Sequence, residues 1–329
     1  MPLKPAPDEP DTTARRRARE RRRAEQSRRT RVGLLLVAAG VVAFMLGARS
    51  GAGSEDEGAA PGGPARTELP GGGLEILPDR RVVAFYGAPQ DEELGALGIG
   101  SPDRAAEELL RQAEPYDSTR RPVLPALELI STVAIAEPGN DGSYSDRQTG
   151  HVIERYLAAA RRAGALLILD IQPGRADFMD EVEHLAEYID EPDVGLALDP
   201  EWHLGPGEVP GQVIGSVSAR AVNQVAAYMS QIVEENDLPQ KLLIVHQFTA
   251  DMISNREQLE PRPGVATVLN SDGFGDQPNK IAKYKQLRPA GSLDAFYPGF
   301  KLFYGEDIDL MSPEQVLELN PAPDVVIYE

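Results

Sequence analysis

From position 81 onward, short apolar runs alternate with segments whose apolar residues recur at helical spacing. The runs are rich in Val, Ile and Leu and almost continuous, which is typical of strands in a parallel sheet that is covered on both faces. We predict eight strands, at 81–87, 127–135, 165–171, 194–199, 242–247, 265–270, 300–304 and 324–328.

The segments between these runs carry the one-sided apolar stripes of amphipathic helices. Such stripes are formed by Val152, Tyr156 and Ala160, by Phe178, Val182, Leu185 and Ile189, and by Val222, Val225, Met229 and Ile232. Serine followed by proline at 101–102 and 312–313 predicts two helix starts.

Eight strands with intervening helices across 81–329 match a (β/α)8 TIM barrel. The main alternative is a doubly wound open sheet. It is disfavoured as a nucleotide-binding fold because Gly87-Ala88-Pro89 after the first strand is no glycine-rich phosphate loop. Since the chain stops at the eighth strand, we expect the eighth outer helix to be missing or replaced by residues before 81.

The N-terminal part has a different character. Residues 32–48 (VGLLLVAAGVVAFMLGA) are uncharged and follow Arg28, Arg29 and Arg31, which predicts a single transmembrane helix with a cytoplasmic N-terminus and an extracellular C-terminal domain. A cleaved signal peptide ending near Ser50-Gly51-Ala52 is the alternative. We therefore expect a basic cytoplasmic tail (1–31), a membrane anchor (32–48), a flexible linker (49–77) rich in Gly, Pro and Ala, and the barrel domain (78–329).

Composition narrows the function. The formal net charge is −19, of which residues 1–31, with Lys4 and ten arginines against five acids, contribute +6 and the rest of the chain −25. So acidic a domain would repel phosphate backbones, and we expect it to bind no nucleic acid. The absence of cysteine excludes disulfides, thiolate zinc sites and cysteine nucleophiles. We expect a monomer without a cofactor or bound metal.

The fourth run ends in Asp199-Pro200-Glu201-Trp202-His203. Active sites of TIM barrels lie where the strands end, and side chains alternate along a strand, so Asp199 and Glu201 are expected on the same side, with Cα atoms roughly 6–7 Å apart. Neighbouring carboxyl groups shift each other's pKa, so that one can stay protonated while the other is ionised. Glycoside hydrolysis requires such a pair. The alternative is a buried ion-paired network without a catalytic role.

The stretch VGLALDPE (194–201) resembles the fourth-strand D-x-D-x-E signature of the chitinase-like family 18 glycoside hydrolases. The resemblance implies that Glu201 is the proton donor and Asp199 its partner. Ala197 stands where the family has its first Asp and Pro200 where it has an aromatic residue. The chain as a whole is also similar to exported barrel proteins of actinobacteria.

Further candidates follow other strand ends. We expect Asp170, His246 and Asp272 to bind substrate hydroxyls, Trp202 to stack on a sugar face or to pack, and Tyr86 and Tyr304 to line the rim of the site. The remaining rim candidates are Lys301, Glu306, Tyr328 and Glu329.

Three functions compete. The first is an anchored glycoside hydrolase that acts on cell-wall or extracellular polysaccharide. The second is a metal-dependent hydrolase with ligands from Asp170, Asp199, Glu201, His203 and His246. The third is a non-catalytic glycan-binding or envelope-assembly protein on a degenerate barrel, which the departures at Ala197 and Pro200 favour.

Overall fold

A computed structural model describes residues 67–329. Eight parallel strands form a closed barrel in the order β1-β11-β10-β9-β7-β5-β4-β2, and the pairing of β1 with β2 closes it. The barrel strands are β1 (Arg81–Gly87), β2 (Val123–Ala134), β4 (Leu166–Ile171), β5 (Val194–Leu198), β7 (Lys241–Gln247), β9 (Val265–Ser271), β10 (Tyr297–Leu302) and β11 (Val325–Tyr328). The predicted α/β barrel is confirmed, and all eight predicted runs overlap these strands.

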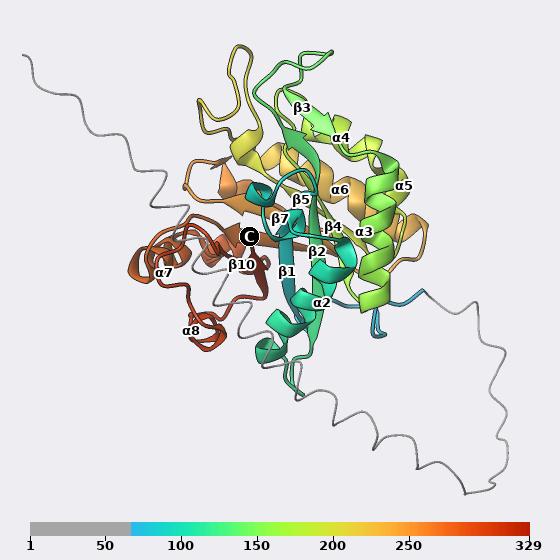
Figure 1. Cartoon of the computed structure of the whole chain (residues 1–329), viewed down its shortest axis with the longest axis vertical. Coiled ribbons are helices and arrows are strands. Elements are labelled where there is room, and N and C mark those ends of the chain that lie inside the picture. The colour runs from blue at the N-terminus through green and yellow to red at the C-terminus, as the bar shows by residue number, and fades with distance from the viewer. Residues whose placement is uncertain (1–66) are drawn as a thin grey trace, which may run out of the picture. The chain divides into compact units, whose positions relative to one another are not determined.

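Helices surround the barrel (Figure 1), with α3 and α5 on one side and α7 and α8 on the other. They are α2 (Pro102–Ala113), α3 (Gly150–Ala163), α4 (Phe178–His184), α5 (Ala186–Ile189), α6 (Ala219–Glu235), α7 (Gln277–Leu287) and α8 (Pro313–Leu317). The predicted caps are present: Ser101 Oγ accepts from the backbone of Arg104, and Ser312 forms a reciprocal capping box with Gln315.

The barrel departs from eight regular βα units at one connection. Between β7 and β9 the chain forms only the two-residue strand β8 (Ile253–Ser254) and a 3-10 turn (Arg256–Gln258). β8 pairs with β6 (Val217–Ser218) from the β5–α6 connection. A short strand β3 (Ser145–Arg147) pairs antiparallel with the end of β2.

Two apolar clusters hold the fold. The larger one lies between strands and helices and includes every residue of the stripe Val222, Val225, Met229 and Ile232. The other fills the barrel with alternate strand residues, among them Val82 and Ala84 of β1 and Leu242 and Ile244 of β7. This alternation tells which strand residues point inward.

Residues that precede β1 pack with the inner cluster. Leu69, Ile76 and Leu77 are at most 3% exposed and belong to it. The side-chain oxygen of Gln240 accepts hydrogen bonds from the backbone of Ile76 (2.8 Å) and Leu77 (2.9 Å), just before β7 begins. The end of the segment predicted as a linker thus contributes core residues at the N-terminal end of the barrel.

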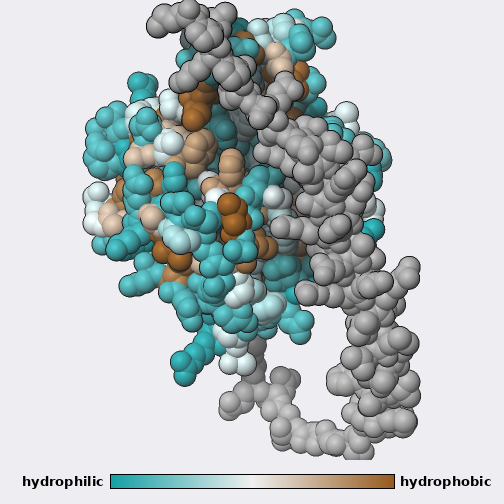
Figure 2. Space-filling view, turned by 60° about the vertical axis from the view of Figure 1, so that its left-hand side comes forward, coloured by the Kyte–Doolittle hydropathy of each residue, from teal (hydrophilic) through white to brown (hydrophobic). Residues whose placement is uncertain are grey.

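The face seen in Figure 2 is largely hydrophilic with separate hydrophobic patches. Large exposed apolar side chains in the described part include Ile214, Phe274 and Ile308. Among residues 67–329, none of the helices has the length and apolar character needed to span a membrane. The predicted tail, anchor and most of the linker lie outside the described residues.

Candidate functional site

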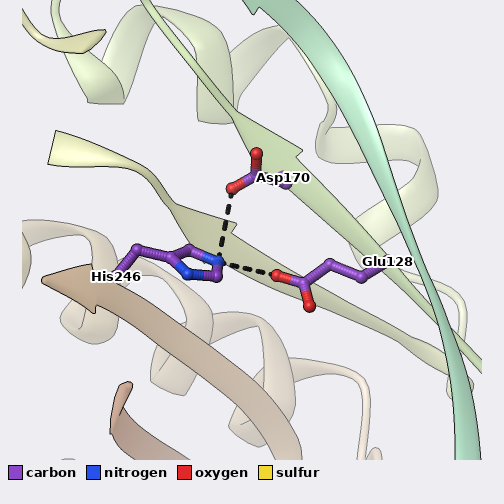
Figure 3. Close-up of side chains that lie close together, drawn as sticks. All are labelled: Glu128, Asp170 and His246. Atoms are coloured by element: carbon purple, nitrogen blue, oxygen red, sulfur yellow. Dashed lines mark hydrogen bonds and ion pairs between the residues drawn. The ribbon is translucent and has the colours of Figure 1, made fainter. Parts of the chain in front are cut away.

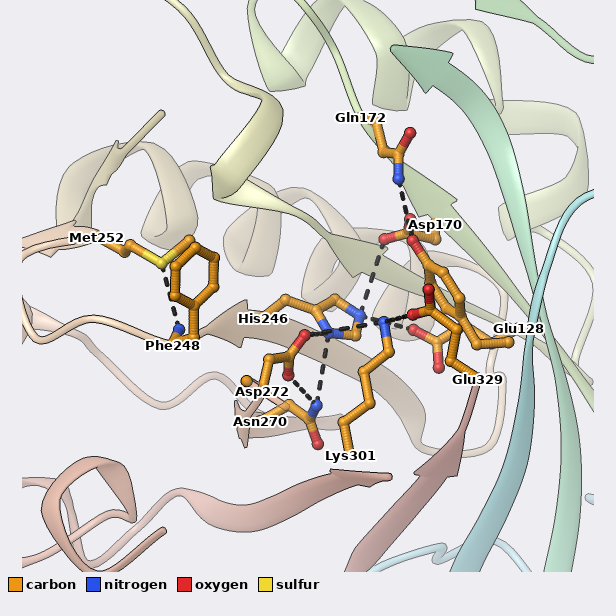
Figure 4. A network of polar contacts seen from close by, with 12 residues as sticks. Glu128, Asp170, Gln172, His246, Phe248, Met252, Asn270, Asp272, Lys301 and Glu329 are labelled. Carbon is orange, nitrogen blue, oxygen red and sulfur yellow. Dashed lines mark hydrogen bonds and ion pairs between the residues drawn. The ribbon is translucent and has the colours of Figure 1, made fainter. Parts of the chain in front are cut away.

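Every barrel strand contributes a polar or ionisable side chain on its inward face, at or just beyond its carboxyl end except in β2, where the residue lies in the middle of the strand. These residues follow the inward apolar residues at a spacing of two, so the strand alternation that fills the barrel also directs them inward. They are Tyr86, Glu128, Asp170, Asp199, His246, Asn270, Lys301 and Glu329. The carboxyl end of the barrel is therefore lined by a polar network over an apolar core (Figure 4).

His246 is the centre of this network. Its Nδ1 lies 2.8 Å from Oδ2 of Asp272, and its Nε2 lies 2.8 Å from Oε1 of Glu128. Burial alone would lower the pKa of His246, but the charges and hydrogen bonds of Asp272 and Glu128 raise it well above the usual value. In this arrangement the imidazole is protonated and donates to a carboxylate at each nitrogen.

Asp170 lies beside this histidine and is held by a second chain of hydrogen bonds. The Tyr86 hydroxyl donates to Oδ2 of Asp170 at 3.0 Å, and Gln172 Nε2 donates to the same hydroxyl at 3.0 Å. Burial, followed by the charge of Asp199, raises the pKa of Asp170 well above its usual value. Asp170 thus favours its neutral, protonated form beside the protonated His246.

Lys301 supplies the second cation. Its Nζ lies 2.7 Å from Glu329, 3.8 Å from Asp272 and 3.4 Å from the centroid of the Tyr86 ring. Burial would lower the pKa of Lys301, but Glu329 and Asp272 raise it. Lys301 and His246 together hold the pKa of Asp272 below its usual value despite its burial.

Asp199 and Glu201 lie at the end of β5 next to this network. Asp199 is 7% exposed, and burial raises its pKa to about 6. Glu201 is half-buried, and desolvation together with the negative charges of Asp199 and Asp272 raises its pKa to about 7. Two neighbouring carboxyl groups therefore titrate near neutral pH, where one can exchange protons while the other is charged.

The expected strand alternation does not extend to Glu201. β5 ends at Leu198, and Pro200–Trp202 form a 3-10 turn, although the Asp199 amide still bonds to Ile171. Proline fixes φ and offers no amide hydrogen for the ladder, so the strand stops there. Glu201 approaches Asp199 through this turn.

The remaining candidates are distributed unevenly. Five of the candidates meet in one network, namely Tyr86, Asp170, His246, Asp272 and Lys301. Trp202 is half-buried in the turn that carries Glu201. Tyr304 lies apart: its ring stacks on Tyr328, which faces the outer core, and its hydroxyl donates to Gln112.

Glu128 is the ionisable residue of the network that the sequence did not indicate; two amide members, Asn270 and Gln172, were not among the candidates either. Glu128 is a single acid within the apolar run VLPALELISTVA and is completely buried. The available signal was its spacing of two and four residues from Ala126 and Leu124, which places it inside the barrel. His203, a ligand in the metal-dependent alternative, instead places its Nδ1 2.6 Å from the carbonyl of Ser216.

One subset of the network has the donor types of a metal site. One ligand atom from each of Glu128, Asp170 and His246 lies within 4.8 Å of the others, and all three side chains are buried (Figure 3).

Fold and site together define an α/β-barrel protein with a TIM-barrel-like arrangement and a buried ionisable network at the carboxyl end of the strands. No protein-family model matches the chain, and a comparison with curated proteins finds no significant match.

Proposed function

We propose that the carboxyl end of the barrel is the active site of a hydrolase that cleaves glycosidic bonds in a cell-wall or extracellular polysaccharide, and that residues 32–48 anchor the chain in the membrane. Glu201 donates the proton to the leaving-group oxygen. Asp199 is the charged partner that stabilises positive charge at the sugar carbon. The family 18-like stretch 194–201 suggests the same assignment.

One observation carries the proposal: Glu201 is half-buried, has a pKa of about 7 and lies next to a more deeply buried aspartate. A general acid acts best when its pKa lies near the working pH, because it is then protonated and still able to release the proton. Glycoside hydrolysis requires a protonated carboxyl group and an ionised one on the same substrate.

The deep burial of the network changes the roles expected of its members. Asp170 and His246 are at most 1% exposed and already contact Tyr86, Glu128 and Asp272. We therefore assign them to positioning and charge balance rather than to direct sugar contact. Glu201 and Trp202, which retain exposed surface, remain the candidates for touching substrate.

The test is reducing-sugar release by the full-length protein from bacterial wall glycans and chitin-type polymers. Glu201→Gln keeps the size of the side chain but removes the acid. Glu208→Gln, an exposed glutamate in the same β5–α6 connection, is the matched control. Release that is lost with Glu201→Gln and kept with Glu208→Gln supports the proposal.

Release that survives Glu201→Gln would show a glycosidase with a different acid. Failure to release sugar from any glycan, combined with retained glycan binding, would favour the non-catalytic alternative.

A further inference from the structure

The side chains of Glu128 and Asp170 converge on the Nε2 atom of His246. Oε1 of Glu128 lies 2.8 Å and Oδ1 of Asp170 lies 3.9 Å from this nitrogen, and the three ligand atoms lie within 4.8 Å of one another. Ligands bound at about 2.0–2.2 Å to one ion are separated from each other by about 3–4 Å. The observed spacing needs only small side-chain shifts to match such a shell.

Two oxygens in this cluster lack hydrogen-bond partners. Oε2 of Glu128 and Oδ1 of Asp170 accept no hydrogen bond from the described residues. Both residues are 0% exposed, so solvent does not reach these oxygens either. Figure 3 shows both carboxylates directed toward the His246 ring. A buried carboxylate oxygen without a partner is costly unless a group outside the chain satisfies it.

The hydrogen bonds around His246 and Asp170 orient these side chains in the way that hydrogen bonds to the ligands of a metal site do. Asp272 lies 2.8 Å from Nδ1 of His246, and Asn270 in turn donates to Asp272. A histidine that binds a metal through one nitrogen commonly donates its other N–H to a carboxylate, which fixes the tautomer. The Tyr86 hydroxyl orients Asp170 through its other oxygen, Oδ2, leaving Oδ1 available.

Charge balance also favours a cation here. In the part of the chain that the structure describes, two cations, Lys301 and a protonated His246, pair directly with members of a larger set of carboxyl groups at the barrel end, which are Glu128, Asp170, Asp199, Asp272 and Glu329. A divalent ion among these groups would offset the excess negative charge more directly than solvent, from which most of them are removed.

We propose that Glu128, Asp170 and His246 bind one divalent transition-metal ion inside the carboxyl end of the barrel, with Asp272 as the outer partner of the histidine. Two carboxylates and one imidazole suit Zn²⁺, Mn²⁺ or Fe²⁺, whereas Mg²⁺ and Ca²⁺ prefer shells made of oxygen alone. Binding requires Nε2 to be free of its proton, and the ion replaces the contact between Nε2 and Glu128. This proposal is independent of the proposed glycosidase activity, because metal binding is measured without a substrate.

The experiment measures metal binding by the full-length protein after treatment with chelator. Zn²⁺ affinity is measured in competition with a chromogenic chelator, and Mn²⁺ binding by the loss of the free-ion signal in electron paramagnetic resonance. The expected result is one tight equivalent per chain. Asp170→Asn and His246→Gln should abolish it, and Asp272→Asn should weaken it about 10- to 100-fold through the histidine.

Two controls separate this site from weak binding to an acidic surface. His203→Gln changes a histidine near the same barrel end whose Nδ1 already contacts Ser216, and Asp294→Asn removes an exposed carboxylate. Both should bind like the parent chain. Circular dichroism checks that Asp170→Asn, the mildest of the ligand changes, remains folded.

The proposal is overturned if the parent chain binds no tight equivalent of either ion, or if folded Asp170→Asn and Asp272→Asn bind as tightly as the parent. If the parent chain binds neither ion tightly, the position between His246 and Glu128 is occupied by a shared proton and not by a metal. Glycan hydrolysis would be unaffected by that result, so the two proposals fail separately.

Discussion

Nε2 of His246 lies 2.8 Å from Oε1 of Glu128 although the residues are 118 positions apart in the sequence. Their strands, β7 and β2, are separated in the sheet by β5 and β4. The contact therefore runs across the barrel interior, and the 2.8 Å contact of Nδ1 with Asp272 ties the same ring to the end of β9. A single imidazole thus connects three segments of the barrel.

Removing Glu128 should destabilise the fold more than its size alone suggests. Glu128→Ala leaves a buried imidazolium with one partner fewer, a change that costs about 3–5 kcal/mol in comparable buried pairs. Glu128→Gln keeps an acceptor and should cost less. Urea unfolding measures both, with chelator present so that no bound cation contributes. Glu107→Ala, on the exposed face of α2, is the control and should unfold like the parent. Equal midpoints for all variants would show that the contact does not form in solution.

The proposed acid and its partner should produce a narrow pH optimum. Glu201 must be protonated, so activity should fall as the pH rises through about 7, and Asp199 must be ionised, so activity should fall as the pH drops below about 6. In Asp199→Asn the negative neighbour that raises the pKa of Glu201 is gone. The alkaline limb of the residual activity should therefore move to lower pH, as measured by kcat/KM against pH. If the alkaline limb does not move, a group other than Glu201 is responsible for it.

Asp199 should also reduce stability at neutral pH. Its folded-state pKa of about 6 lies above its unfolded value of 3.8. The native state therefore binds more protons between these values, and stability falls as the pH rises through that window. Asp199→Asn should be more stable than the parent near pH 8, by on the order of 1–3 kcal/mol, and no more stable near pH 4. Thermal unfolding at both pH values checks this, with Asp294→Asn as the exposed control. A gain of equal size at both pH values would point to packing instead of charge.

The sequence predicted the framework well because its signals are local. Continuous apolar runs mark strands that are buried on both faces, and the stripe from Val222 to Ile232 marks one face of a helix. The predicted bounds of some strands were less accurate. β2 begins at Val123, four residues before the predicted run, and β10 ends at Leu302, before Phe303 and Tyr304. The connection from β7 to β9 carries no α-helix, so a pattern of eight regular units was only approximate.

The site was harder to predict because its contacts are tertiary. Strand ends pointed to Asp170, His246 and Asp272, which do meet. Glu128 lies within its strand rather than at the end of the predicted run, and only the parity of β2 relative to the barrel places it beside His246. The turn at Pro200 could not be anticipated from alternation, because a proline ends the pattern on which that argument depends.

Gly299 should be required for the packing beneath the network. A Cβ at this position of β10 would lie 2.3 Å from Oδ1 of Asn270 and 2.8 Å from Cγ1 of Val268. Gly299→Ala should therefore cost about 1–3 kcal/mol through overpacking and displace the amide that donates to Asp272. Denaturant unfolding of Gly299→Ala, Asn270→Ala and the double variant measures the coupling. The double variant should be more stable than the sum of the single losses predicts. Additive losses would mean that the clash is relieved elsewhere.

Residues 67–77 should stabilise the barrel from its N-terminal end. Leu69, Ile76 and Leu77 are buried in the inner cluster, and Gln240 binds the backbone of the last two. A chain that begins at residue 78 loses these contacts, whereas one that begins at residue 67 keeps them and serves as the matched control. In the longer chain, Ile76→Ala should cost about 2–5 kcal/mol, the range for emptying a well-packed aliphatic site. Urea unfolding measures all three proteins. If the shorter chain is as stable as the longer one, the segment before β1 is dispensable and the inner cluster is complete without it. If it is less stable by more than Ile76→Ala alone, the segment closes the barrel as a unit, because Leu69 and the Gln240 hydrogen bonds are lost together with Ile76.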